Sequence, residues 1–218
     1  MYPAFRKFCV LACFALLFSA CGRPDILAPP CASGVCVSKS NALTVTAVVA
    51  TDKESWVYLD LDTGKEVKVT DPMKNKTWDL AFQRYRIKSN SGISGKGGVG
   101  VAIVDRKTLK ELAGTNTTED FDLLDGPTLL GKVTKAPKTG YVSDMDDEDG
   151  DGDEDLVFLQ EGAWYDYDFG KHILTPKKRV FIVRTTEKKY FKVLLRSYYS
   201  SEGYSGTMSF WSSELLAP

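Results

Sequence analysis

The sequence predicts an all-β domain, mainly antiparallel, with one or two short helices. In most segments apolar residues alternate with polar ones or form short β-branched runs, and a period of two is that of a strand with one buried face. Turn signals such as Asp62-Thr63-Gly64 separate neighbouring segments, which favours hairpins. A hydrophobic content of 43% over 218 residues suits one globular core.

The expected elements can be placed in order along the chain. Hairpins are expected around Asp62-Thr63-Gly64 and around Glu187-Lys188. Residues 118–124 favour a short capped helix, because Thr118 precedes a run of acidic and apolar residues. The strands that the alternation predicts, apart from the central stretch, are residues 43–50, 56–61, 66–69, 156–160, 164–168, 180–185, 190–197 and 207–211.

The central stretch, residues 77–100, joins two strand patterns through glycine. Apolar residues lie two apart from Trp78 to Phe82, and the pattern slips by one residue near Gln83. We therefore expect one or two strands with a bend or bulge at that point. The second half of the stretch holds five glycines and leads into a further strand over residues 99–103, which indicates a glycine-rich connection between strands.

The glycines of this stretch do not form a nucleotide site. Gly95-Lys96-Gly97-Gly98-Val99-Gly100 matches G-x-G-x-x-G and begins like a phosphate-binding loop. Such a loop continues with a lysine for the phosphates and a serine or threonine for the metal, and then opens a helix. Val101 and Ala102 stand in those places and begin a strand, so a phosphate-binding loop is excluded.

The first twenty residues, 1–20, resemble a lipoprotein signal peptide. A basic pair precedes an apolar run of signal-peptide length that is too short to span a bilayer. The run ends in Leu17-Phe18-Ser19-Ala20-Cys21, so we expect Cys21 to be diacylated and to anchor the mature chain to a membrane. Gly22 after the cysteine resembles lipoproteins sorted to an outer membrane, and we expect surface exposure there. The alternative is plain secretion with a free Cys21 thiol.

Residues 21–41 are expected to form a tether to the membrane, because proline and serine are frequent there. Cys31 and Cys36 lie in this segment with four residues between them. In an oxidising compartment the two cysteines can close a small disulfide loop. A metal site is the alternative, but no histidine or further cysteine lies nearby in the sequence. The β domain then spans residues 42–218.

Charge is unevenly distributed along the mature chain. Loss of Arg6 and Lys7 with the signal peptide leaves 26 of the 28 basic residues against 29 acidic ones, a net charge of −3. Nine of the acidic residues lie in the acidic loop, residues 144–155, so the rest of the mature chain has 26 basic and 20 acidic residues, or +6. Because the basic residues are scattered and the protein is exported, nucleic-acid binding is not indicated.

The acidic loop has the spacing of a calcium site. Carboxylates occupy positions 1, 3, 5 and 9, Gly152 stands at the turn position 6, and a carbonyl at position 7 adds a ligand. Position 12 is Phe158 rather than glutamate, so the pattern resembles the EF-like loops of β proteins. The alternative is a solvated acidic insert whose like charges repel. The ligands that the spacing predicts are Asp147, Asp149, Asp151, Asp153 and Asp155.

His172 is the only histidine of the chain. A lone histidine is commonly a structural or surface residue, although it can serve as a ligand or a base. A hydrolase would need a placed nucleophile and an orienting acid beside it, and no local nucleophile motif occurs, so we expect no enzymatic activity. Tyrosines that are candidates for the core or for a binding rim cluster towards the C-terminus. These are Tyr165, Tyr167, Tyr198, Tyr199 and Tyr204.

Three blocks of the sequence resemble the HmuY family, bacterial surface lipoproteins named for a haem-binding member. They are TWDLAFQRYRIKSNSGISGKGGVG at residues 77–100, WYDYDFGKHILTPKKRVFIVRT at 164–185 and KYFKVLLRSYYSSEGYSGTMSFW at 189–211. The resemblance covers residues 42–213, is specific in the blocks that contain Trp78 and Trp164, and is loose between Lys107 and Gln160.

The resemblance implies an all-β surface protein that binds haem and passes it to an outer-membrane transporter. Haem iron takes histidine or methionine as axial ligands, so His172 is the candidate ligand. The two-histidine ligation of the family cannot be carried over to a chain with one histidine, and nothing in the sequence selects among Met73, Met145 and Met208 as the second ligand. The alternative is a protein with the same fold that does not bind haem and serves as a calcium-stabilised adhesion or interaction module at the cell surface.

We expect Cys21→Ser to leave an uncleaved or unlipidated precursor, because only the thiol accepts the diacylglycerol. The measurement is partitioning between a detergent phase and an aqueous phase. Cys13→Ser removes a cysteine of the signal peptide outside the Cys21 motif and is the control, which should partition like the wild type. If Cys21→Ser also partitions like the wild type, Cys21 is not the lipid site.

Overall fold

The computed structural model describes residues 28–40, 43–92, 94–104, 138–139, 164–177 and 179–215. Within these ranges the chain forms strands and no helix, so the all-β class is confirmed. This part of the chain also holds no helix that is long and apolar enough to cross a membrane. The short helix expected at 118–124, the strand expected at 156–160 and the acidic loop lie outside the described residues.

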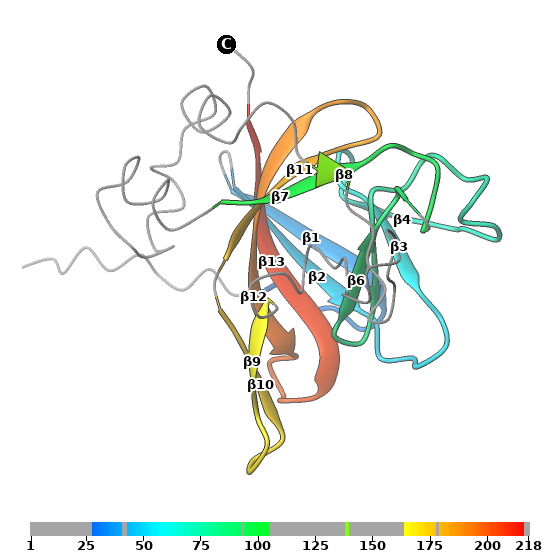
Figure 1. Cartoon of the computed structure of the whole chain (residues 1–218). Coiled ribbons are helices and arrows are strands. Elements are labelled where there is room, and N and C mark those ends of the chain that lie inside the picture. The colour runs from blue at the N-terminus through cyan, green and yellow to red at the C-terminus, as the bar shows by residue number, and fades with distance from the viewer. Residues whose placement is uncertain are drawn as a thin grey trace, which may run out of the picture.

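The described strands run antiparallel to their neighbours and form three sheets (Figure 1). In chain order they are β1 (Gly34–Ser40), β2 (Leu43–Val49), β3 (Val57–Asp60), β4 (Lys65–Val67), β5 (Leu80–Gln83), β6 (Arg86–Ser89), β7 (Gly100–Ile103), β8 (Lys138–Thr139), β9 (Tyr165–Asp168), β10 (Ile173–Pro176), β11 (Val180–Arg184), β12 (Tyr190–Tyr199) and β13 (Ser205–Leu215). The large sheet has the order β1-β2-β13-β12-β11-β7-β8, the small sheet has the order β4-β3-β5-β6, and β9 pairs with β10.

The main hydrophobic core joins the large sheet to the small sheet. Phe82 of β5 stacks on Phe210 of β13, with ring centroids 5.8 Å apart, and both side chains are buried. Trp164, next to β9, is also buried, and its Nε1 donates a hydrogen bond to the Tyr85 carbonyl over 3.1 Å. Burial of a large apolar side chain contributes about 2–3 kcal/mol, so these aromatic residues attach the three sheets to one another.

Asp79 links the two larger sheets through buried hydrogen bonds. Its Oδ2 accepts the Leu61 N–H over 2.8 Å, and its Oδ1 accepts the Thr186 N–H over 2.7 Å. Leu61 follows β3 of the small sheet, and Thr186 follows β11 of the large sheet. Burial raises the pKa of Asp79 to about 6, although both hydrogen bonds favour the ionised form. One carboxylate therefore holds the ends of two sheets together.

Asn90 organises the glycine-rich connection in a similar way. Its Nδ2 donates to the Trp78 carbonyl over 2.8 Å, and its Oδ1 accepts the Gly97 N–H over 2.9 Å. A Cβ on Gly95 would come within 2.0 Å of Asn90 Oδ1, and a Cβ on Gly97 within 2.6 Å of the same side chain. The glycines are therefore needed because the connection closes tightly around the amide of Asn90.

Both hairpins expected from their turn residues are present. β3 pairs with β4 around Asp62-Thr63-Gly64, and β11 pairs with β12 around Glu187-Lys188. The irregularity expected near Gln83 is a tight turn between β5 and β6, in which Arg84 has a left-handed φ of 52°. The Arg84 N–H donates to the Ala50 carbonyl over 2.7 Å, which fixes this turn against the end of β2.

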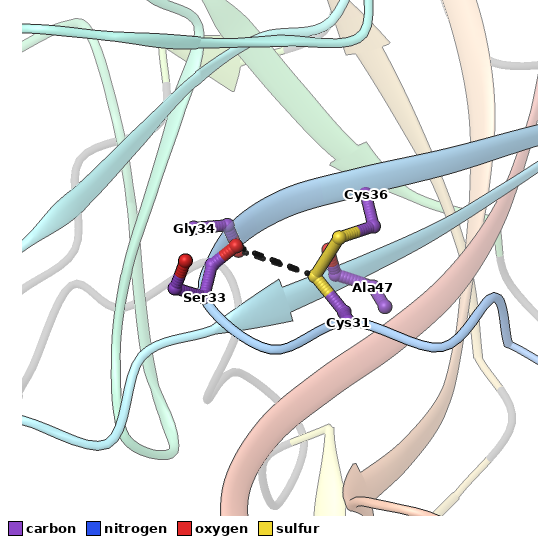
Figure 2. The surroundings of a disulfide bond; sticks show 5 residues. All are labelled: Cys31, Ser33, Gly34, Cys36 and Ala47. Carbon is purple, nitrogen blue, oxygen red and sulfur yellow. Dashed lines mark hydrogen bonds between the residues drawn. A yellow bond between two sulfur atoms is a disulfide. The ribbon is translucent and has the colours of Figure 1, made fainter.

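The prediction that residues 21–41 form a tether is wrong for residues 34–40, which form β1 and pair with β2 along their whole length. The frequent prolines belong to the part before Cys31, whereas Val35, Cys36 and Val37 favour a strand. Cys31 and Cys36 are joined by a disulfide with a Cα–Cα distance of 5.6 Å. Figure 2 shows the bond beside Ala47 of β2.

We expect Gly206→Ala to destabilise the protein more than Gly203→Ala. The φ angles of the two glycines are similar, 91° and 86°, so both variants carry the backbone strain of a left-handed residue, about 1–2 kcal/mol. A Cβ on Gly206 would also come within 2.9 Å of the Thr51 Cα, whereas nothing lies within 4 Å of a Cβ on Gly203. The free energies of unfolding come from urea titrations. If the two variants lose the same free energy of unfolding, the close approach of the chain to Thr51 does not contribute to stability.

Candidate functional site

A pocket with a volume of about 740 Å³ lies where the β5–β6 turn, the β9–β10 hairpin and the β12–β13 turn approach one another. Six tyrosines, one histidine and one arginine are among its lining residues. The full lining is Arg84, Tyr85, Tyr165, Tyr167, His172, Leu174, Tyr198, Tyr199, Gly203, Tyr204 and Ser205. The volume is within the range of small-molecule sites, roughly 300–1,000 Å³.

The β9–β10 hairpin forms one wall of the pocket. Figure 1 shows it extending beyond the large sheet, next to the turn that joins β12 to β13. The Leu174 N–H of β10 donates to the hydroxyl of Tyr199 at the end of β12 over 2.9 Å, so the hairpin is attached to the large sheet through β10 at the level of Tyr167, the partner of Leu174. Towards its tip, Phe169 is 82% exposed and Tyr167 is 42% exposed, and this wall therefore presents aromatic rings to solvent.

His172 and Tyr167 form a hydrogen-bonded pair within this wall. His172 lies in the turn of the hairpin with a left-handed φ of 55°, and its Nδ1 is 2.8 Å from the Tyr167 hydroxyl oxygen. Either group can be the donor, depending on the imidazole tautomer. When Nδ1–H donates to the tyrosine oxygen, the lone pair of Nε2 is free for a ligand.

Aromatic rings and one cation form the remaining walls. Tyr85 and Tyr165 meet edge to face with centroids 5.9 Å apart, and Tyr198 and Tyr199 do so at 5.2 Å. Burial raises the pKa of Tyr198, and the charge of Arg84 opposes that shift. The guanidinium of Arg84 is oriented by the Thr51 carbonyl and the Ser205 hydroxyl, each 3.3 Å away. The pocket therefore suits a flat apolar ligand that carries negative charge.

The structure brings together residues that the sequence indicated only singly. His172 and the five C-terminal tyrosines of the sequence analysis all line the pocket. Arg84, Tyr85 and Leu174 were not expected there. Arg84 and Tyr85 lie in the central stretch, whose strand pattern gave no reason to treat them as site residues, and Leu174 resembles any other apolar strand residue.

The methionines considered as second haem ligands do not lie at the pocket where the structure describes them. Met208 is fully buried in the main core, so its thioether cannot reach a bound molecule. Met73 lies in the turn before the central stretch and is not part of the lining. Met145, Cys21 and the five predicted calcium ligands of the acidic loop lie outside the described residues.

The described part of the chain is an all-β protein with an aromatic pocket between the ends of its strands. The chain belongs to the HmuY family, because the family described as HmuY protein matches residues 52–211. This confirms the resemblance carried by the Trp78 and Trp164 blocks. Among curated proteins no match was found.

Solved structures that resemble this chain include three bacterial proteins. A candidate lipoprotein from Bacteroides fragilis has a TM-score of 0.50 and 21% identity, over 87% of this chain and 100% of that chain. A candidate HmuY-like haem-binding protein from Bacteroides vulgatus has a TM-score of 0.48 and 21% identity, over 83% of this chain and 97% of that chain. An apo HmuY analogue from Tannerella forsythia has a TM-score of 0.46 and 18% identity, over 84% and 98% of the two chains.

Proposed function

We propose that this protein binds haem at the cell surface, anchored through lipid on Cys21, and passes haem to an outer-membrane transporter without enzymatic activity. The observation that carries the proposal is that His172, the chain's only histidine, lines a tyrosine-rich pocket of about 740 Å³. Membership of the HmuY family supports haem as the ligand, because the family is named for a haem-binding member. The lipid anchor is supported by the sequence around Cys21.

The residues of the pocket fit haem. Haem offers an iron that takes axial ligands such as histidine or tyrosine, a flat apolar ring and two carboxylates. Among the lining residues, the imidazole of His172 would bind the iron through nitrogen. The rings of Tyr85, Tyr165 and Tyr198 would pack against the flat haem ring. The guanidinium of Arg84 can pair with a carboxylate. Outside the acidic loop the mature chain has a charge of +6, which favours approach of an anionic ligand.

Tyr167 is the positioning residue for His172 in this proposal. A hydrogen bond at Nδ1 fixes both the orientation and the tautomer of a ligating imidazole, and removal of such a partner commonly weakens metal binding about 10- to 100-fold. The distance of 2.8 Å between Nδ1 and the Tyr167 oxygen is short enough for this role. Tyr167→Phe keeps the ring and removes only the hydroxyl.

We expect haemin to give a sharp Soret band with the wild type, and His172→Asn to remove it. Asparagine tolerates the left-handed φ of position 172, so the substitution removes the imidazole with little strain. Tyr167→Phe should weaken binding about 10-fold or more while the band persists. Affinity is measured by titrating haemin and following the Soret absorbance.

Lys188→Asn is the matched control for this titration, because Lys188 also has a left-handed φ and lies in a turn that is not part of the pocket. Its haemin affinity should equal that of the wild type. A Soret band that survives His172→Asn unchanged would contradict the assignment of His172. Absence of any saturable haemin binding by the wild type would contradict the proposed function and favour the adhesion module.

We also propose that the acidic loop binds calcium through Asp147, Asp149, Asp151, Asp153 and Asp155, on the basis of their spacing in the sequence. Calcium should slow cleavage by a glutamyl endopeptidase after Glu148 and Glu154, because a bound ion offsets the repulsion between the acids and orders the loop. In the double variant Asp149→Ala, Asp151→Ala this protection should be lost. Asp52→Ala with Asp71→Ala, which removes two acids outside the loop, should retain it. Equal cleavage of the wild type with calcium and with chelator would mean that the loop is a solvated insert.

A further inference from the structure

Three carboxylates converge at the end of the small sheet that carries the β3–β4 turn. Asp60 ends β3, Asp62 lies in the turn, and Asp79 directly precedes β5. One carboxylate oxygen from each residue lies within 4.8 Å of the other two. Three negative groups this close repel one another unless a positive charge lies between them.

Asp62 is the member of this cluster that points most directly to a ligand. Its side chain is only 2% exposed, and neither of its buried oxygens accepts a hydrogen bond from the residues that the structure describes. A buried carboxylate without hydrogen-bond donors is costly, and such groups in proteins are commonly paired or bound to metal. Asp62 Oδ1 has an ion-pair partner in Lys189, whereas the buried Oδ2 has no partner among the described residues and is the atom that points to a further cation.

The other two carboxylates are oriented by backbone groups without being saturated by them. Asp79 accepts one N–H at each oxygen, from Leu61 and Thr186, and Asp60 Oδ1 accepts the Thr63 N–H over 3.1 Å. A carboxylate has about four acceptor positions, so each of these groups keeps lone pairs for a further partner.

Lys189 supplies part of the missing positive charge. Its Nζ lies 3.3 Å from Asp62 Oδ1 and 2.9 Å from Glu187 Oε2, so one ammonium group is shared between two acids. The Lys189 side chain is 44% exposed, so its ammonium group is only partly removed from solvent. One shared ammonium leaves the cluster with an excess of negative charge.

We propose that Asp60, Asp62 and Asp79 bind a divalent cation, with calcium as the best match, at a site distinct from the acidic loop. Calcium binds carboxylate oxygens at about 2.3–2.6 Å, so two oxygens on one ion lie up to about 5 Å apart, and the three oxygens of the cluster, all within 4.8 Å of one another, satisfy this limit. Magnesium requires about 2.1 Å and strict octahedral geometry. Zinc favours nitrogen and sulfur ligands, and the cluster offers neither.

The position of the cluster indicates a structural role for the ion. Asp60 and Asp62 belong to the small sheet and its turn, and Asp79 bonds to Thr186 in the turn that precedes β12 of the large sheet. An ion held by all three would lock the two sheets together at this end. The haem pocket lies at the other end of β12, a strand of ten residues, roughly 30 Å away at about 3.3 Å per residue.

The test uses the full mature chain in which the acidic loop has been silenced by replacing Asp147, Asp149, Asp151, Asp153 and Asp155 with asparagine. We expect calcium to raise its melting temperature above the value in chelator, since an ion that binds only the folded state stabilises it. In the same background, Asp62→Asn should remove this rise. Its melting temperature in chelator should be equal to or above that of its parent, because the substitution removes a buried charge that an ammonium shared with Glu187 offsets only in part.

Two further variants complete the experiment. Asp71→Asn removes an exposed turn carboxylate that pairs with Lys74 and should leave the calcium-dependent rise intact. Lys189→Gln should tighten calcium binding several-fold in calorimetric titration, because the competing ammonium is removed. A loop-silenced parent that melts identically with calcium and with chelator overturns the proposal. So does an Asp62→Asn variant that melts lower by the same amount in both media, since Asp62 would then be only the ion-pair partner of Lys189.

Discussion

The arrangement of the two larger sheets depends on the buried carboxylate of Asp79, which accepts backbone N–H groups from Leu61 and Thr186. Its burial raises its pKa to about 6, so the bonds it makes must offset a desolvation cost. Asp79 directly precedes β5, and its partner Thr186 lies in the turn that precedes β12. The hydrogen bond between them therefore fixes where β5 and β12 begin relative to each other. Those strands lead to Arg84 at one wall of the pocket and to Tyr198 at another, so the hydrogen bonds of Asp79 help to position two walls of the pocket from the opposite end of the sheets.

The β9–β10 wall is attached more weakly than the other two walls. A two-stranded hairpin is at best marginally stable by itself, and this one relies on the buried ring of Trp164 and on the bond from Leu174 to the Tyr199 hydroxyl. Elements with few buried contacts open most readily in native proteins. The wall that carries His172 and Tyr167 is therefore the wall best suited to admit and release a ligand, whereas the β5–β6 turn and the end of β12 form the fixed part of the pocket.

Most strands follow from the sequence because alternation of apolar and polar residues directly reports a sheet with one buried face. The strand at residues 34–40 was missed because the prolines before Cys31 dominate the composition of the whole segment. The pocket could be anticipated only as separate residues: His172 and the tyrosines were notable, but their convergence is set by contacts between elements far apart in sequence. Asp60, Asp62 and Asp79 were missed for the same reason, since the first two resemble ordinary turn residues and the third lies beyond another strand.

We propose that the pocket built on the strand ends that Asp79 positions holds haem through His172. A crystal structure of the protein with haemin, with anomalous data collected at the iron absorption edge, tests it most directly. We expect one strong iron peak between the β9–β10 hairpin and the β12–β13 turn, within bonding distance of the imidazole of His172. An iron peak elsewhere on the molecule, or a pocket without iron under saturating haemin, would contradict it.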